Sequence, residues 1–239
     1  MAKLLTFRKL FRPAREEVPA YKQFHYLNKL AADRVTEILL FSEEEKLAEL
    51  MPDVAQKKVL FLSDQKHRFS FKKIQSLNPG MLLNYVYENE AALEQQPNSG
   101  TIYGNLKKMP LKHMSYDVLV CPLAIYEPGI TAELIASLSQ VVKNGGRVII
   151  SIRHPQLEHV LYNQNPAQNV SLENSLSAYF KIFKNNNLYT EEIEEGFVDT
   201  SLKPFFTVEG EYDHYHEYKG LPLTLRFRLV KFVRTVGKK

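Results

Sequence analysis

Two histidines near the carboxyl end of the chain have a spacing that could support chemistry. They are His214 and His216, in a stretch that also contains Tyr212 and Tyr218. If this stretch is an extended strand, its alternate residues point to one face, and the four side chains form one row. Two histidines on a strand can bind a metal, but no third ligand can be assigned from the sequence, so no metal site is predicted. The row instead suggests a substrate surface made of Tyr212, His214 and His216. A solvated hairpin with half-buried aromatic residues is the alternative.

Two further candidates follow apolar runs that have the composition of buried strands. His154 comes after the run 147–152, and Glu127 comes after the run 116–123. In open α/β sheets, ligands bind beyond the carboxyl ends of the strands. His154 is therefore a candidate substrate contact or general base, and Glu127 has the same standing. For His154, a structural turn before Pro155 is the alternative.

The single cysteine, Cys121, lies within an apolar run. Free cysteines are among the most buried residues, so we predict a small buried hydrophobe and not a nucleophile. One cysteine also excludes a disulfide framework, which fits a reducing compartment. No apolar stretch approaches the roughly 20 residues of a membrane span, and the first residues lack the features of a signal peptide. We therefore expect a cytoplasmic protein.

Charge is concentrated at the start of the chain. The net charge of the 239 residues is +4, and residues 1–20, with five basic and two acidic side chains, contribute +3 of it. The remaining body is nearly neutral, which argues against nucleic acid as a partner. The basic arm 1–20 is interleaved with apolar residues, which suits a membrane surface or a groove on a protein partner. A short helix packed on the body is the alternative.

The hydrophobic pattern predicts alternating helices and strands in a body that can bury a core without disulfides. Residues 21–51 have helical periodicity, and Ser42 to Glu45 read as a capping box that opens a second short helix. Apolar strand-like runs then alternate with helix-like segments; the strands are 59–62, 81–86, 101–103, 116–123 and 147–152, and the helices are 69–77, 88–95 and 131–142. Near-continuous apolar strands separated by helices predict a mostly parallel sheet covered on both faces.

The last third of the chain predicts an antiparallel ending to that sheet. A helix at 172–184 is followed by three asparagines, which can adopt the left-handed conformation of a helix C-cap. Residues 188–197 then have the pattern of a strand. Residues 221–230 alternate apolar and polar side chains in their middle, as a half-exposed antiparallel strand does. The expected ending is therefore an antiparallel hairpin.

Several segments follow one another in an informative order: GNLKKMPL at 104–111, SYDVLV at 115–120, VVKNGGRVII at 141–150 and the closing stretch from 218 to 231. Together they resemble class I S-adenosylmethionine-dependent methyltransferases of the small-molecule, ubiquinone/biotin-pathway type. The resemblance covers roughly residues 21–234. It implies an α/β fold with a doubly wound, mostly parallel seven-stranded sheet and a C-terminal antiparallel hairpin. In the methyltransferase-like domain 21–239, residues 21–51 form N-terminal helices, 57–152 the cofactor-type half, and 153–239 a substrate-side insertion with the closing hairpin.

The resemblance also implies S-adenosylmethionine as cofactor, held by an acidic-x-Gly-x-Gly-x-Gly loop after the first strand. Glycine is used there because it permits unusual backbone angles and lets the main chain approach the ligand. Here Phe61, Ser63, Gln65 and His67 occupy those places. We therefore expect the cleft beneath the first strand to be narrowed or filled by His67 or Arg68.

Two other cofactor contacts of the family are altered as well. Tyr87 matches the acid that binds the ribose hydroxyls, with Glu88 next to it, and Asn105 matches the adenine-contacting Asp. A reduced set of cofactor contacts would consist of Ser63, Asp64, Glu88 and Asn105.

Two function classes follow. One is methyl transfer to a small or carrier-bound molecule, with that molecule as the binding partner. The other is a catalytically inactive pseudoenzyme that uses the fold as a binding or scaffold module for a protein partner. A dinucleotide-dependent dehydrogenase would need a Gly-x-Gly-x-x-Gly loop, which the chain lacks.

Overall fold

The computed structural model describes residues 32–63, 68–87, 101–104, 111–122, 132–155, 157, 176–206 and 214–233. The basic arm 1–20 lies outside these residues, as does the helix expected at 88–95. Among the described helices, none combines the length and the apolar content needed to cross a membrane.

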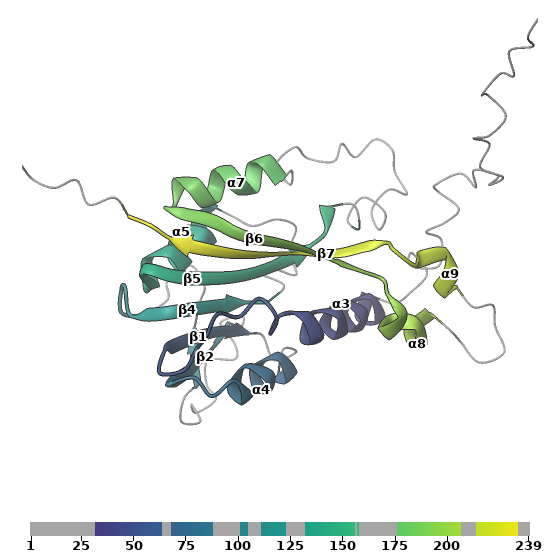
Figure 1. Cartoon of the computed structure of the whole chain (residues 1–239), viewed down its shortest axis with the longest axis horizontal. Coiled ribbons are helices and arrows are strands. Elements are labelled where there is room, and N and C mark those ends of the chain that lie inside the picture. Colours follow the sequence, from purple (N-terminus) through teal and green to yellow (C-terminus); the bar gives the residue numbers. More distant parts are fainter. Residues whose placement is uncertain are drawn as a thin grey trace, which may run out of the picture.

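A seven-stranded sheet with the order β3-β2-β1-β4-β5-β7-β6 forms the centre of the fold (Figure 1). Its strands are β1 (Lys58–Ser63), β2 (Met81–Tyr87), β3 (Thr101–Gly104), β4 (Tyr116–Cys121), β5 (Val142–Arg153), β6 (Leu188–Phe197) and β7 (Pro222–Lys231). The first five strands pair in parallel, and β7 runs antiparallel to both β5 and β6. The predicted mostly parallel sheet with an antiparallel closing strand is confirmed.

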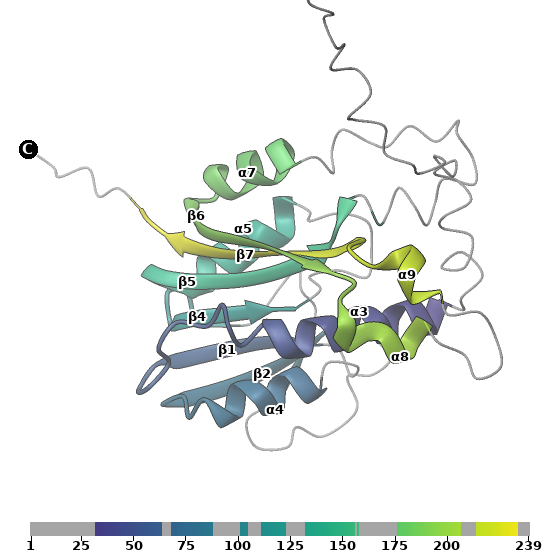
Figure 2. The same ribbon diagram turned by 45° about the vertical axis from the view of Figure 1, so that its right-hand side comes forward.

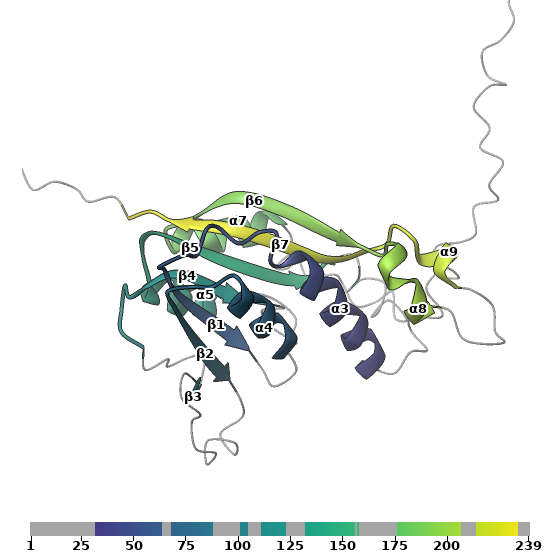
Figure 3. The same cartoon turned by 60° about the horizontal axis from the view of Figure 1, so that its bottom comes forward.

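The apolar runs form the middle of this sheet because helices cover both of its faces. Val59, Leu60, Phe61 and Leu62 of β1 are fully buried, although alternate residues point to opposite faces. Helices α3 (Ala32–Lys46) and α4 (Arg68–Ser76) lie on one face, and α5 (Ala132–Val141) and α7 (Leu176–Asn185) lie on the other (Figure 3). The predicted doubly wound arrangement is therefore confirmed.

Helix α3 corrects one sequence-based expectation. It continues through Ser42 to Glu45 without a break, so the predicted capping box and second short helix are wrong. Ser42 and Glu43 are both buried in its last turns, with Glu43 fully inaccessible. The polar run 42–45 predicts a helix start, but in the structure it places the carboxylate of Glu43 in the interior.

A small helical layer fills the connection between β6 and β7 (Figure 2). It contains the 3-10 turn η6 (Thr200–Leu202), α8 (Lys203–Phe206) and α9 (Tyr215–Tyr218). Tyr215 and Tyr218 are buried in a core cluster with the first half of α3. The extended row expected around His214 is therefore wrong, because residues three apart share a face in a helix. This layer follows the carboxyl end of β6 and packs against α3 in one core cluster.

The turn between α7 and β6 matches its prediction. Asn187 has a left-handed backbone with a φ of 59°, and its amide donates to the carbonyl of Lys184 at 3.1 Å. Asparagine tolerates this conformation better than most residues. The three-asparagine stretch thus ends the helix, and β6 begins at Leu188.

Strand β7 is more deeply buried than its alternating pattern predicted. Leu225, Phe227 and Leu229 belong to the core cluster that contains α5 and α7. On the opposite side of the strand Arg226 is only 2% exposed. The half-exposed strand is therefore a wrong expectation, because α3 covers the polar face as well.

Asp117 on β4 gives a stability prediction at the amino end of the sheet. Its carboxylate accepts hydrogen bonds from Lys143 Nζ at 2.6 Å and from the Lys58 amide at 2.9 Å. Partial burial raises the pKa of Asp117, but these bonds and the charges of Lys143 and Lys57 outweigh it and hold the pKa below its ordinary value. Replacing Asp117 by Asn should cost about 1–2 kcal/mol at neutral pH, measured by urea unfolding.

The pH dependence provides the internal control for this prediction. A carboxyl with a lowered pKa stabilises the folded state above its unfolded pKa, and this contribution is lost as the pH falls through the folded pKa. Wild-type and Asp117→Asn proteins should therefore converge in stability at strongly acidic pH. If the two proteins differed in free energy of unfolding by the same amount at neutral and at strongly acidic pH, the stabilising role of the Asp117 carboxylate would be contradicted.

Candidate functional site

The carboxyl edge of the parallel strands is where the fold places a ligand site. Strands β1, β4 and β5 end there at Ser63, Cys121 and Arg153. The loops after β1, β2 and β4 lie outside the described residues. Five predicted site residues fall in undescribed segments: Asp64, Glu88, Asn105, Glu127 and Tyr212.

The end of β1 contains Phe61 and Ser63, which the sequence resemblance aligns with the family's acid and first glycine. Phe61 is fully buried in a core cluster that includes Ile74 of α4, and it pairs with Asn84 and Val120 of the neighbouring strands. Ser63 is still paired with Val86 in the parallel ladder. At these two positions the chain therefore has a core side chain and a sheet residue, which do not fit the family's acidic and glycine contacts.

His154 immediately follows β5 and is 8% exposed. Its amide donates to the Leu223 carbonyl at 2.8 Å, and its Nε2 lies 3.8 Å from Glu195 Oε1. Burial lowers the pKa of His154 below its ordinary value, and the Glu195 carboxylate only partly offsets this. The ring is therefore neutral at neutral pH, as a general base or a satisfied core histidine would be. Its role as a substrate contact stays a prediction.

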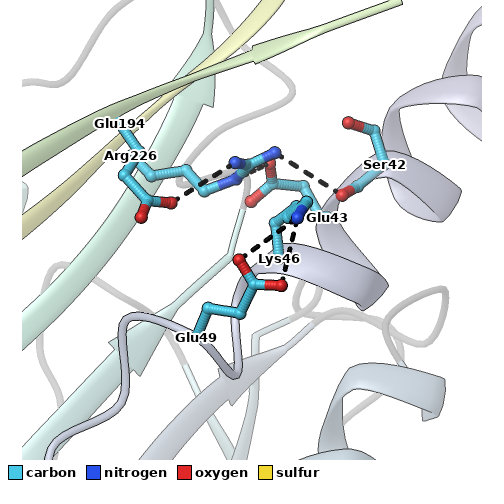
Figure 4. A network of polar contacts seen from close by, with 6 residues as sticks. All are labelled: Ser42, Glu43, Lys46, Glu49, Glu194 and Arg226. Atoms are coloured by element: carbon cyan, nitrogen blue, oxygen red, sulfur yellow. Dashed lines mark hydrogen bonds and ion pairs between the residues drawn. The ribbon is translucent and has the colours of Figure 1, made fainter. Parts of the chain in front are cut away.

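A buried polar network that the sequence reading missed links α3 to the sheet (Figure 4). Arg226 Nε donates to Glu43 Oε1 at 2.8 Å, and the two side chains are 2% and 0% exposed. Arg226 Nη1 lies 3.7 Å from Glu194 Oε2, and its Nη2 donates weakly to the Ser42 carbonyl at 3.5 Å. The signal in the sequence was an arginine in the middle of a strand and a polar run inside a helix. Neither pattern indicates that Arg226 pairs with Glu43.

A pocket of about 230 Å³ lies beside this network, between α3, the end of β6 and η6. Its lining residues include Ser42, Lys46, Gly196, Asp199, Ser201 and Arg226. Asp199 accepts hydrogen bonds from the Ser201 amide and hydroxyl at 2.9 and 2.6 Å, which shape the rim. None of its lining residues comes from β1, β2 or β4, so the pocket is separate from the ends of those strands.

No known family's sequence profile matches this chain, and no curated protein sequence matches it. Solved structures are nevertheless similar. An S-adenosylmethionine-dependent methyltransferase from Listeria monocytogenes is 15% identical with a TM-score of 0.59, and the similarity covers 82% of this chain and 100% of that one. The chain has the class I S-adenosylmethionine-dependent methyltransferase fold.

Two other structures with the methyltransferase fold give the same result. A methyltransferase in complex with the Trm112 activator, from Haloferax volcanii, is 13% identical with a TM-score of 0.59, covering 90% of this chain and 99% of that one. Geranyl diphosphate C-methyltransferase from Streptomyces coelicolor A3(2) is 13% identical with a TM-score of 0.54, covering 92% and 100%. Such identities establish the fold, while function depends on the site.

On this methyltransferase fold, the histidines near the carboxyl end do not form the predicted row. His214 precedes α9, and its Nδ1 lies 3.1 Å from Glu217 Oε2. His216 is exposed within α9, and its ring centre lies 5.6 Å from that of Tyr215. No group of three or more potential metal-binding side chains occurs in the part of the chain that the structure describes. Substrate binding by these residues stays untested.

Cys121 matches its prediction as a core residue at the end of β4. It is 1% exposed, and burial raises the pKa of its thiol to about 12. A thiol that stays protonated at neutral pH is a poor nucleophile. Cys121 therefore contributes packing to the methyltransferase fold.

Gly196 gives a second stability prediction, at the wall of the pocket. A Cβ added there would come closer than 3.0 Å to Thr224 Oγ1 and Arg226 Nη2. Because Arg226 is held by Glu43, it cannot move aside freely. Replacing Gly196 by Ala should cost about 1–3 kcal/mol through overpacking, measured by urea unfolding.

A double substitution tests this cause. Adding Thr224→Ala to the Gly196→Ala variant removes one of the two clashing atoms, so the second change should cost less in this background than in the wild type. Strict additivity of the two costs would show that the clash is not the cause.

Proposed function

We propose that this chain uses the methyltransferase fold as a binding or scaffold module and does not hold S-adenosylmethionine in the family's manner. The observation that carries this proposal is the end of β1. Phe61 is buried in the core where the family has an acid, and Ser63 remains paired in the sheet where the family has its first glycine. The two further glycine positions hold Gln65 and His67.

The physical reason is that side chains replace close main-chain approach. Glycine lets backbone groups contact the ligand directly, and any side chain adds volume in the same space. In addition, Phe61 puts a buried aromatic ring at the position where the family has a carboxylate. The supporting features are therefore a lost charge and added side chains at the same strand end.

A second candidate is methyl transfer to a small or carrier-bound molecule. It is favoured by the complete seven-stranded order and by a neutral, buried His154 at the carboxyl edge of β5. The reduced set of cofactor contacts would be Ser63, Asp64, Glu88 and Asn105, with His154 or Glu127 near the substrate. Methyl transfer depends mainly on positioning, so the absence of an evident acid–base pair does not exclude this candidate.

A protein partner fits the first candidate. One structure with this fold is a complex of a methyltransferase with the Trm112 activator. We propose that a partner protein is also the ligand of this chain, with the basic arm 1–20 as an additional contact to that partner or to a membrane surface. A cytoplasmic location is part of this proposal.

Calorimetric titration of the full chain with S-adenosylmethionine and S-adenosylhomocysteine tests the choice between the candidates. The binding-module proposal expects no saturable binding of either compound in the micromolar range. Clear low-micromolar binding of S-adenosylhomocysteine would contradict the proposal and favour the enzyme. Thermal denaturation with and without each compound gives an independent measurement, because a ligand that binds only the folded state raises Tm.

A further inference from the structure

Strand β6 forms one edge of the sheet and has features of a strand that accepts a partner. It is last in the strand order, and its only neighbour among the described strands is β7 (Figure 3). It is 10 residues long. Natural proteins protect such edges with short strands, charged side chains, bulges or a covering element, because the outer row of amides and carbonyls can pair with another chain.

One face of this edge carries more carboxylates than cations. Glu191 and Glu192 both reach Arg228, at 3.4 and 2.6 Å, because a register irregularity between Thr190 and Glu192 brings consecutive residues to the same arginine. Arg147 gives Glu191 a second cation at 3.0 Å. Glu192 remains 39% exposed at the margin of the strand.

The same imbalance is repeated at the next pair along this face. Arg226 is shared between Glu43 at 2.8 Å and Glu194 at 3.7 Å, and Glu194 is 32% exposed. Glu195 lies on the other face of the strand, because it pairs with Leu225 while Glu194 pairs with Arg226, and its Oε1 lies 3.8 Å from Nε2 of His154. On this face four carboxylates, those of Glu43, Glu191, Glu192 and Glu194, thus meet three arginines, so the face keeps a surplus of negative charge.

The opposite face of the edge is apolar around Ile193, with Glu195 two residues further along the strand. Ile193 is 41% exposed and pairs with Phe227, whose ring lies 5.3 Å from that of Phe183 in α7. Phe180 of α7 also contacts Phe227, at 6.4 Å between ring centres, and is 39% exposed. Ile193 and Phe180 are therefore two exposed apolar side chains that both neighbour Phe227, whose own ring is fully buried.

From these two faces we infer that the β6 edge binds an extended segment of a partner protein in which basic and apolar residues alternate. A strand added to β6 presents successive side chains to opposite faces. Its basic residues would lie beside Glu192 and Glu194, and its apolar residues beside Ile193. Cross-strand pairs of opposite charge and of apolar residues both stabilise such pairing. This proposal names a partner surface for the binding module proposed above and rests on that function.

A second copy of the chain is a poor occupant of the same edge. Pairing β6 with another β6 would place its four glutamates next to the same four glutamates. Like charges opposite each other on neighbouring strands are destabilising. The charge pattern therefore selects a different chain.

The test uses the full-length protein and a fluorescent 10-residue peptide that alternates lysine and valine, matching β6 in length. Binding is followed by fluorescence anisotropy. We expect saturable binding that weakens with salt, and no binding of the matched peptide that alternates glutamate and valine. Ile193→Lys and Glu192→Lys should each weaken binding at least tenfold. The control is Met81→Lys, which makes the same kind of change at a 44% exposed position on β2 and should leave the affinity unchanged.

Circular dichroism of each variant establishes that it is folded. Equal binding to the Met81→Lys and Ile193→Lys proteins, or no binding to the wild type, would overturn the proposal. So would a dimer in sedimentation that Ile193→Lys dissociates, because the occupant would then be a second copy. The titration with S-adenosylmethionine reports separately on the proposed function. If the peptide does not bind and S-adenosylmethionine does not bind either, the β6 docking surface is contradicted while the binding-module proposal stands.

Discussion

Replacing Glu43 by Ala should lower the free energy of unfolding by about 3–5 kcal/mol, because it leaves a buried cation without its partner. Arg226 is 2% exposed, and its short hydrogen bond is to Glu43 at 2.8 Å. The remaining carboxylate, on Glu194, lies 3.7 Å away. Without Glu43, the guanidinium must either stay poorly compensated or draw water into the space between α3 and β7.

The measurement is urea unfolding followed by circular dichroism. The matched control is Glu49→Ala, six residues further along the chain and just after the end of α3. Glu49 pairs with Lys46 at 3.0 Å, but these side chains are 55% and 43% exposed. An exposed pair of this kind contributes about 0–1 kcal/mol. Similar losses in the two variants would show that the Glu43 pair is not buried in solution.

A third variant separates burial from charge. Replacing both Glu43 and Arg226 by Leu and Met removes the pair without leaving a charge behind, and such exchanges are often neutral or stabilising. The double variant should therefore be more stable than Glu43→Ala alone. This comparison reports on the buried charge, because both variants lack the ion pair.

The sheet could be predicted from the sequence because its signals are local. The run 188–197 was expected as a strand and is β6, Leu188–Phe197. The three asparagines at 185–187 were expected to provide a left-handed helix C-cap, and Asn187 has a φ of 59°. In each case the neighbouring residues carry the information: apolar runs for buried strands, and asparagine for the positive φ.

The errors have a common physical origin in contacts between distant segments. Glu43 and Arg226 are 183 residues apart, so neither the capping-box pattern nor the alternation in β7 could reveal that they pair. The stretch around His214 has the alternation of a strand, yet Tyr215 and Tyr218 pack as one helical face against the core that α3 completes. Tertiary packing overrode a weak local pattern at both places.

The candidate site was predictable only in part. His154 was placed at the carboxyl edge from the position of its strand, and the structure has it directly after β5. The pocket beside Arg226 had no sequence signal, because it depends on Gly196 leaving room for a side chain from β7 and on α3 crossing the same region. Its residues come from three segments that are far apart in the chain.

Glycine at Ser63, Gln65 and His67 together should strengthen S-adenosylmethionine binding at least a hundredfold over the wild-type chain, for which we expect weak or undetectable binding. Each lost or strained contact costs on the order of 1 kcal/mol or more, so three together correspond to a hundredfold or more in affinity. Micromolar affinity, usual where such contacts are intact, would then become near millimolar. The Ser63 substitution is the most demanding of the three, because Ser63 belongs to the β1–β2 ladder.

The matched control places glycines at Lys66 and Arg68, which lie between and beside the family's positions and are not among the expected cofactor contacts. It raises the flexibility of the same loop without opening the backbone where the family contacts its ligand. Calorimetry should detect binding to the first variant and none to the control. Equal gains in both would show that flexibility alone limits binding, and low-micromolar affinity in the wild type would show that the side chains at these positions do not obstruct the cofactor. In that last case the buried Phe61 would be compatible with an active enzyme, and His154 would become the first residue to substitute in a methyl-transfer assay.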